Sequence, residues 1–412
     1  MIDYFYSKPA DLRRLRTGPL GSCIDPFATL LAEQGYCRLP ARRKIRLIAA
    51  LNRWLLRKHL TVRHLNEERV QAFLLTQWKR VRPLDGDQAT LALFLRQLRQ
   101  SGVISRVLVR TPNSPSETLE RDYKRFLVSE RGLTEATVIA YARIMGRFLS
   151  YQFPNGRIRL ERLSPKDISE FILDQASRHG RKWLQLTASV LRSFLRFLYE
   201  HGQLATNMVG AVPRVAGWRL SELPRFLEAD QVERLLRCCG QRGELGGRDY
   251  AILLLLARLG LRAGEIVRLT LDDINWQAGE LLIKGKGARV DRVPLLKDVG
   301  QALAYYLQKE RPKCSVRDVF IRTKAPRHGL SNPSTIDEIV ARALTRANLQ
   351  PQHRGAHLLR HSLATRMLRG GASLTEIGEV LRHQQVQTTE IYAKVDLDSL
   401  RALAQPWPGG TR

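Results

Sequence analysis

The chain has 412 residues, of which 44% are apolar, and this is enough for two or three domains with buried cores. Its formal net charge of +29 is unusual for a metabolic enzyme and indicates a polyanionic partner. The longest apolar run, Ala251–Ala257, is far too short to span a bilayer, so the charge favours nucleic acid over a membrane.

The N-terminus and the cysteines both indicate where in the cell the protein acts. The first 16 residues include an acidic residue, Asp3, and no apolar signal core, so we expect no secretion signal. The five cysteines are odd in number and show no CxxC spacing, which predicts neither a disulfide framework nor a zinc knuckle. A reducing, cytoplasmic location is therefore expected.

Helical periodicity begins in the first 110 residues. The segment Arg43–Leu56 places apolar residues on one stripe with basic residues between them, and Thr137–Leu149 has the same pattern. Residues 39–55 align with residues 133–149 at an offset of 94. After four extra residues in the second copy, residues 65–74 align with residues 163–172, which places Asn66 and Ser164 at equivalent helix N-cap positions. The alignment predicts two small helical bundles related by duplication, although any two amphipathic helices followed by a capped third would align comparably.

The first bundle carries a strong positive charge. Residues 1–110 contain 21 Lys and Arg against 8 Asp and Glu. A solvated basic face would explain such a surplus, but basic residues interleaved with helical apolar positions favour a domain that contacts DNA. Polar, proline-containing connectors are predicted at 110–117 and 206–224, and the last globular segment begins near Leu223.

Strand signals are sparse in the last segment. The clearest is Gly279–Ile283 followed by Val290–Leu295, joined by a Gly-Lys-Gly turn, which predicts a hairpin. Lys286 lies at its tip, where an ammonium can reach a DNA groove and act as a general acid. A solvated turn lysine is the alternative. Strand alternation places Lys284 on the same side as Lys286.

A basic cluster can be assembled from two further segments. Arg262 follows an apolar helix, and its planar fork suits two phosphate oxygens, while Glu265 can hold the guanidinium or cap a new helix. A purely structural Arg–Glu pair is the alternative. His357, Arg360 and His361 share one helical face. Two histidines at this spacing suggest zinc, but HLLRH lacks the glutamate of HExxH and Arg360 would repel a cation, so no metal is expected.

The last candidates are His383 and Tyr392, separated by a polar stretch predicted to be an ordered loop. A tyrosine hydroxyl can attack a phosphodiester if a base or cations assist, because its ordinary pKa is about 10. Core packing is the alternative for a tyrosine between Ile391 and Ala393. No phosphate-binding loop, nucleophile elbow or dinucleotide fingerprint is present, and no cofactor is expected.

These segments, LGLRAGE, IKGKGARVDRVPL, HLLRHSLAT and TTEIYAKV, together resemble the tyrosine recombinase (phage integrase) family in order and spacing across residues ~115–400. The resemblance implies a mainly α, multi-domain protein with a small β-hairpin or sheet in the catalytic domain, forming a C-shaped clamp around duplex DNA. The implied domains are an N-terminal basic helical domain (1–110), a core-binding domain (115–205), a linker (206–221) and a catalytic domain (222–412).

The resemblance also implies the chemistry. Tyr392 attacks the scissile phosphate and forms a 3′-phosphotyrosine, Arg262 and Arg360 hold its non-bridging oxygens, His357 and His383 assist, and Lys286 protonates the leaving 5′-oxygen. Neither metal nor ATP is required. A helix at Ser399–Ala404 would dock onto a neighbouring protomer in a tetramer on synapsed DNA.

Two departures from the family pattern stand out. Arg382 precedes His383 where the family usually has glycine, and the first 110 residues exceed the minimal architecture. This N-terminal addition favours a mobile element, with integration, excision, transposition, inversion and replicon resolution all open, as are accessory proteins. A type IB topoisomerase, a non-catalytic DNA-binding protein and a metal-dependent nuclease are the competing interpretations.

Overall fold

The structure is a computed structural model that describes residues 2–78, 86–105, 114–216, 224–240, 246–285 and 289–395. Residues 107–221 form one compact unit, and residues 1–106 group with residues 222–412 in the other. The described residues contain three extensive hydrophobic cores, one in each of the segments 2–104, 119–212 and 227–359. The division into three domains stays a prediction.

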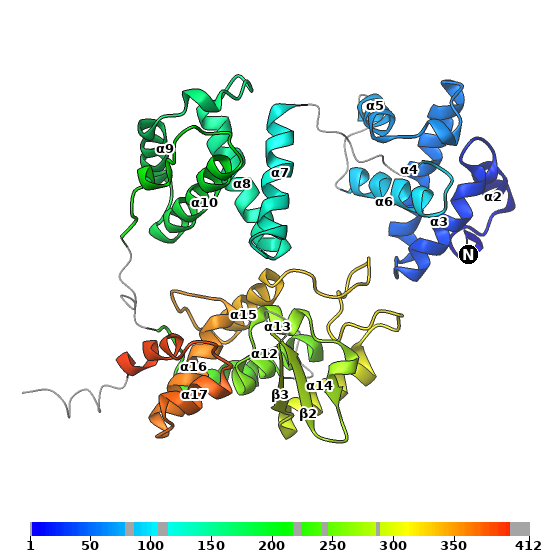
Figure 1. The fold of residues 1–412 in the computed structure, drawn as a ribbon. Coiled ribbons are helices and arrows are strands. Elements are labelled where there is room, and N and C mark those ends of the chain that lie inside the picture. Colours follow the sequence, from blue (N-terminus) through cyan, green and yellow to red (C-terminus); the bar gives the residue numbers. More distant parts are fainter. Residues whose placement is uncertain are drawn as a thin grey trace, which may run out of the picture. The chain divides into compact units, whose positions relative to one another are not determined.

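The N-terminal segment is entirely helical where it is described (Figure 1). Its elements are α1 (Ile2–Phe5), α2 (Pro9–Arg16), α3 (Gly21–Glu33), α4 (Arg38–Arg57), the 3-10 turn η1 (Val62–His64), α5 (Glu67–Trp78) and α6 (Asp87–Gln100). The long helix α4 buries one face, and its Asn52 accepts from Leu20 N at 2.9 Å and donates to Thr17 O at 2.7 Å. This amide therefore fixes the loop that leads into α3. Asn66 caps α5, as predicted, by accepting from Arg69 N at 3.0 Å.

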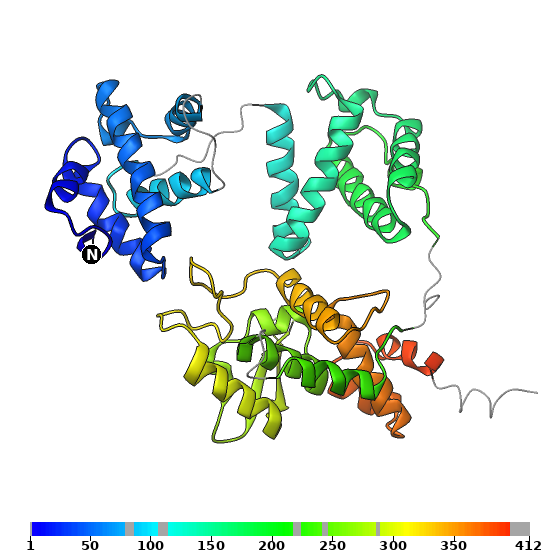
Figure 2. The same cartoon turned by 180° about the vertical axis from the view of Figure 1, so that it is seen from behind.

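The second helical segment has the same plan, and Figure 2 shows its cyan and green helices from behind. Its elements are α7 (Pro115–Ser129), α8 (Glu135–Gln152), η2 (Leu160–Arg162), α9 (Pro165–Arg178), α10 (Arg181–Glu200) and η3 (Val209–Ala211). Ser114 caps α7 and Ser164 caps α9 in a reciprocal capping box with Asp167. Pro115–Glu117, predicted as connector, are the first turn of α7, because the Ser114 cap and the proline at the first helical position both start a helix there.

The last segment contains the remaining helices and all described strands. Its helices are α11 (Ala229–Cys238), α12 (Gly246–Leu259), α13 (Ala263–Val267), η4 (Leu271–Asp273), α14 (Lys297–Tyr305), the π-helical turn η6 (Tyr306–Glu310), α15 (Ser334–Arg346), α16 (Ala356–Arg369), α17 (Leu374–Val380), η7 (Val386–Thr388) and η8 (Glu390–Val395). Every residue of the apolar run Ala251–Ala257 in α12 is buried. A helix that is apolar all round is a core helix, and α12 packs against α11, α14 and α16.

The strands form a small antiparallel sheet in the order β1 (Ile274–Asn275), β2 (Glu280–Lys284), β3 (Val290–Pro294). Leu281 pairs with Val293 and Ile283 with Asp291, so the predicted hairpin is confirmed. The short strand β1 was not predicted, because two residues give no periodicity. The fold class, mainly α with a small sheet, is likewise confirmed. Across the described residues, none of the helices has the length and apolarity needed to cross a membrane.

Candidate active site

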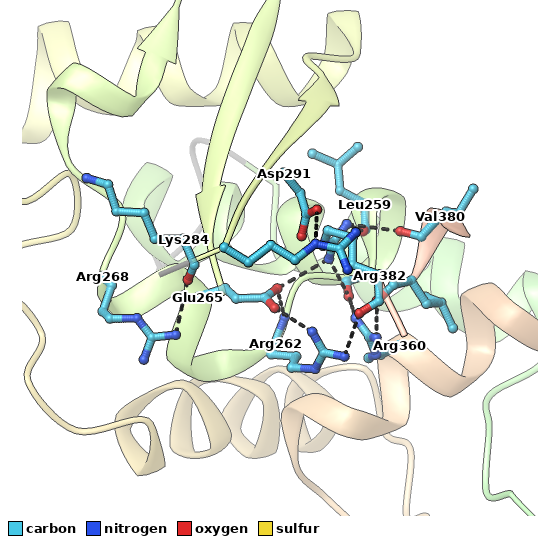
Figure 3. Close-up of polar contacts among 12 residues, drawn as sticks. Leu259, Arg262, Glu265, Arg268, Lys284, Asp291, Arg360, Val380 and Arg382 are labelled. Atoms are coloured by element: carbon cyan, nitrogen blue, oxygen red, sulfur yellow. Dashed lines mark hydrogen bonds and ion pairs between the residues drawn. The ribbon is translucent and has the colours of Figure 1, made fainter. Parts of the chain in front are cut away.

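Arg262 lies at the point where α12 gives way to α13. Its main-chain N–H donates to Glu265 Oε2 at 2.9 Å, and its Nη1 donates to Glu265 Oε1 at 2.6 Å. Glu265 therefore both holds the guanidinium and caps α13, as the sequence predicted. Its side chain is buried, whereas 38% of the Arg262 side chain is exposed, so this guanidinium keeps an open edge toward solvent. Figure 3 shows Glu265 beside Arg262 at the start of α13.

Gly260 allows three elements to meet at this corner. Its φ is +58°, a conformation that favours glycine, and an added Cβ would lie 2.7 Å from Leu381 Cδ2 and 3.0 Å from Leu363 Cδ2. Its carbonyl oxygen accepts a hydrogen bond from Arg360. The glycine therefore lets α12 approach α16 and the end of α17 closely.

Arg360 projects from α16 and is only 3% exposed. It donates to the carbonyl oxygens of Gly260 and Leu381, so neutral acceptors hold its guanidinium. Burial, reinforced by the charges of Arg262 and Arg382, lowers the pKa of Arg360 to about 9. Arg360 is still charged at neutral pH, but its charge is poorly compensated, which is the environment that attracts an anion.

Arg382 supplies a third guanidinium, which is buried like that of Arg360. Its φ of +55° shows that the turn before His383 keeps the left-handed conformation that a glycine would adopt. Its Nη1 donates to Val380 O at 2.9 Å and Leu259 O at 3.4 Å, and its Nη2 donates to Glu265 Oε2 at 3.2 Å. Arg382 thus holds the same carboxylate that holds Arg262 (Figure 3).

The charges of this cluster do not balance. In the described part of the chain, Glu265 is the one carboxylate that pairs with any of these guanidinium groups, and it contacts Arg262 and Arg382 but not Arg360. Burial disfavours its ionised form, but the Arg262 N–H and the charge of Arg382 outweigh burial and lower the pKa of Glu265. Three cations and one anion leave a surplus of two positive charges, which a phosphodiester would reduce.

The histidines line the same region. His357, in the first turn of α16, is exposed, and desolvation, followed by the charge of Arg360, lowers its pKa. His383 is half-buried, with its Nδ1 at 2.7 Å from the hydroxyl of Thr389. Burial, with Arg360 next in importance, lowers the pKa of His383 to about 4. Both rings are therefore neutral at neutral pH.

Tyr392 lies in η8 and is 1% exposed. It packs in a small apolar cluster with Leu363, Leu381 and neighbours, so the core-packing interpretation describes its ring correctly. Its hydroxyl nevertheless has a polar partner, His361 Nδ1, at 2.8 Å. Burial raises the pKa of Tyr392 to about 12, although Arg360 and Arg262 oppose the increase.

The sequence placed His361 on the helical face of His357 and Arg360, as a helix-packing or supporting residue, but did not predict its contact with Tyr392. His361 shares the predicted helical face with His357, and their ring centroids are 6.1 Å apart. Burial, then the charges of His357 and Arg360, lowers the pKa of His361 to about 4. The available signal was the spacing of four from His357, but spacing alone does not identify a partner 31 positions away.

Five of the six predicted site residues are described, and they come from the start of α13, from α16, from the turn after α17 and from η8. Lys286 lies outside the described residues. Its neighbour Lys284 is described, and its Nζ pairs with the buried carboxylate of Asp273 at 2.7 Å. Among the described residues there is no group of three or more His, Cys, Asp or Glu side chains that could hold a metal ion. The predicted helix at Ser399–Ala404 also lies outside the described residues.

Comparison with known proteins identifies the family. The phage integrase family model matches residues 225–398, and the N-terminal SAM-like domain model of phage integrases matches residues 121–202. A protein of Sinorhizobium fredii (strain NBRC 101917 / NGR234), named "Putative integrase/recombinase y4rA", is 41% identical over 99% of both chains. The chain belongs to the phage integrase family of tyrosine recombinases. It is therefore an enzyme of site-specific DNA recombination, which cleaves and rejoins DNA strands.

Other similar proteins agree with this assignment. The tyrosine recombinase XerD of Listeria innocua is 31% identical over 66% of this chain and 93% of its own length. The XerH recombinase bound to palindromic difH, a post-cleavage complex, has a TM-score of 0.56 at 18% identity, covering 73% of this recombinase and 98% of XerH. The Tn1549 transposon integrase with circular intermediate DNA has a TM-score of 0.52 at 18% identity, covering 70% and 99%. These two structures show the shared fold.

Proposed function

We propose that this recombinase cleaves duplex DNA through a 3′-phosphotyrosine at Tyr392 and serves the integration, excision or transposition of a mobile element. The observation that carries the proposal is the contact of the Tyr392 hydroxyl with His361 beside a largely buried arginine cluster that has a surplus of two positive charges. The name of the Sinorhizobium relative and the fold likeness to a transposon integrase support the mobile-element role.

In the proposed reaction, the scissile phosphate takes the place of the missing negative charge. Arg262 and Arg360 hold its two non-bridging oxygens, and His357 and His383 donate hydrogen bonds to it as neutral imidazoles. Groups fixed before the reaction stabilise the crowded transition state without reorganisation. Tyr392 Oη forms a bond to phosphorus while the bond from phosphorus to the 5′-oxygen breaks. Lys286 gives the leaving 5′-oxygen its proton.

The proton of the nucleophile also needs an acceptor. Tyr392 is protonated at neutral pH because its pKa is raised, and His361 is neutral because its pKa is lowered. A neutral imidazole that carries its proton on Nε2 presents Nδ1 as an acceptor. At 2.8 Å from the hydroxyl, His361 is thus placed to receive the phenolic proton as the Oη–P bond forms.

One variant distinguishes two roles of His361, accepting the phenolic proton of Tyr392 or only holding Tyr392 in its buried position. If His361 accepts the proton, His361→Gln slows formation of the covalent adduct and removes the dependence of its rate on the histidine's titration. If His361 only holds Tyr392 in a buried position, the same variant forms the adduct faster than the unchanged enzyme. The measurement is single-turnover adduct formation from about pH 3.5 to about pH 7, a range that includes the lowered pKa of His361 of about 4. His353→Gln, which removes an exposed histidine outside the cluster, is the control.

The proposed partners follow from solved structures of the family. A lambda integrase tetramer bound to a Holliday junction has a TM-score of 0.51 with this chain. That complex supports our proposal that this recombinase binds double-stranded DNA and acts as a tetramer on synapsed DNA. We also propose that Ser399–Ala404 links neighbouring protomers and that the enzyme acts on the nucleoid in the cytoplasm. Accessory proteins are a further class of partner in this proposal.

The deciding experiment uses a nicked suicide duplex of the native flanking DNA, with EDTA present. A covalent protein–DNA adduct on a denaturing gel that is absent from Tyr392→Phe supports the phosphotyrosine. An adduct that persists in Tyr392→Phe places the nucleophile elsewhere. Cleavage only without EDTA indicates a metal-dependent nuclease, and binding without an adduct indicates a DNA-binding protein. Recombination of two sites, as opposed to relaxation alone, separates a recombinase from a type IB topoisomerase.

A further inference from the structure

The first 120 residues are matched by neither family model, although the Sinorhizobium relative covers 99% of the chain. Their helices nevertheless repeat those of the second segment. The order α3, α4, η1, α5, α6 corresponds to α7, α8, η2, α9, α10. The sequence alignment had already paired α4 with α8 and α5 with α9, and the structure adds a helix on each side of these pairs.

The cores of the two segments contain equivalent aromatic pairs. Trp54 and Phe73 meet edge-to-face at 6.0 Å, and their equivalents Phe148 and Phe171 meet edge-to-face at 5.2 Å. These positions are the ones that the offset of 94, followed by four extra residues, aligns.

A second aromatic pair repeats between the first and last helices. Phe27 meets Phe94 at 5.1 Å and 75°, and Tyr123 meets Phe194 at 5.1 Å and 70°. Two independent core contacts thus recur between corresponding helices.

The ends of α6 and α10 are also alike. Residues 94–96 and 194–196 both read Phe-Leu-Arg, and both helices end at a glycine of positive φ, Gly102 at +72° and Gly202 at +67°. Residue 103 donates to Leu98 O at 2.9 Å, and residue 203 donates to Leu198 O at 2.8 Å. This is the same helix-ending turn, with a buried Ile104 or Leu204 after it. Local sequence, core contacts and turn geometry therefore agree on one fold in two copies.

The two copies differ in the charge of their second helix. Helix α4 contains seven basic residues and no acidic residue, whereas α8 contains two arginines and one glutamate. Arg43, Arg46, Arg53 and Arg57 are exposed, and intervals of three, seven and four place them on one face of α4. None of these four forms an ion pair with a carboxylate within the described part of the chain. We call them the α4 arginine stripe.

We propose that residues 21–105 are a duplicated four-helix DNA-binding domain whose α4 arginine stripe binds the backbone of duplex DNA outside the core site. The stripe extends from Arg43 to Arg57, a distance of about 21 Å along the helix, which corresponds to about six base pairs at a rise of about 3.4 Å. Duplex DNA fits because its phosphates present a continuous negative surface to four cations without carboxylate partners. This proposal rests on the proposed function, since it adds a second contact surface for the same DNA substrate.

The test measures how the dissociation constant of the full chain depends on salt, on a long duplex of native flanking DNA and on a core-only duplex. Each phosphate contact contributes about 0.9 to the slope of log Kd against log salt. Arg53→Gln/Arg57→Gln is expected to lower that slope by about 2 on the long duplex and not on the core duplex. The matched control removes two arginines that are already ion-paired, Arg16 with Asp25 and Arg99 with Glu67, and should leave the slope unchanged.

A hydroxyl-radical footprint completes the experiment. Substitution of all four stripe arginines by glutamine should shorten the protected segment by about six base pairs, while adduct formation on the core suicide duplex stays at the unchanged level. The proposal is overturned if the stripe variants leave the salt slope and the footprint unchanged. It is also overturned if they lower the slope equally on the core duplex, because the stripe would then bind the core site. A stripe variant that changes only self-association, seen by sedimentation, also overturns it. If the unchanged enzyme forms no adduct at all, the proposed function fails, and the salt slopes still decide this inference separately.

Discussion

The turn at Arg382 provides the sharpest test of how the arginine cluster is held together. A glycine there would suit the backbone, because a non-glycine residue at φ of +55° costs about 1 kcal/mol. If the turn alone matters, Arg382→Gly should stabilise the protein by about that amount. The contacts of the Arg382 side chain predict the opposite, namely that Arg382→Gly destabilises the protein.

The guanidinium of Arg382 is buried and reaches the Glu265 carboxylate and the carbonyl oxygens of Leu259, Gly260 and Val380. Removing one partner of a buried ion pair costs about 3–5 kcal/mol. The lower end applies here, because Glu265 keeps Arg262 as a second partner. Subtracting the relief at the backbone leaves a predicted loss of about 2 kcal/mol.

Hydrogen exchange of the buried amides of α16 is the suitable assay, because a multi-domain chain does not unfold in one transition. Arg382→Gly should lower their opening free energy by about 2 kcal/mol, and Arg382→Lys, which keeps the charge, should lose less. Without Arg382, Glu265 is held less firmly and positions the Arg262 guanidinium less precisely. Single-turnover adduct formation should therefore slow by about 10- to 100-fold. Protection equal to or above that of the unchanged protein would refute this reasoning.

Three further predictions follow from the same cluster. Glu265→Gln leaves two arginines without their carboxylate and should lower the opening free energy of α16 by about 3 kcal/mol. Asp272→Asn, which removes an exposed ion pair with Arg317, should leave that free energy nearly unchanged. Gly260→Ala should be destabilised by about 2 kcal/mol or more in the same assay, since its Cβ would overlap Leu381 and its φ is positive. The pKa of His383 is lowered to about 4 in the folded protein, so the unfolded chain takes up this proton first as the pH falls below about 6.5. The free energy of unfolding should therefore decline between about pH 6.5 and about pH 4, and His383→Gln should make this decline less steep. If stability declines with pH equally in the unchanged protein and in His383→Gln, the lowered pKa of His383 is contradicted.

Much of this architecture was predictable from local patterns. Apolar spacing predicted α4 and α8, capping residues predicted the starts of α5 and α9, and two β-rich runs around Gly-Lys-Gly predicted the hairpin of β2 and β3. These features depend on neighbours within a few positions, so the sequence contains them directly. The residue types Arg262, Arg360 and Tyr392 also indicated phosphoryl chemistry, because few side chains can neutralise or attack a phosphodiester.

The contacts that assemble the site depended on the tertiary structure. Arg360 bonds a carbonyl 100 positions away, Arg382 bonds a carboxylate 117 positions away, and His361 meets Tyr392 at a separation of 31. Helical periodicity assigns each of these residues to a face but does not specify what packs against that face. The sequence by itself thus determined the elements and the chemical groups, whereas packing of α12, α16 and α17 around Gly260 decided which groups share a carboxylate, which lose water and which hold the tyrosine hydroxyl.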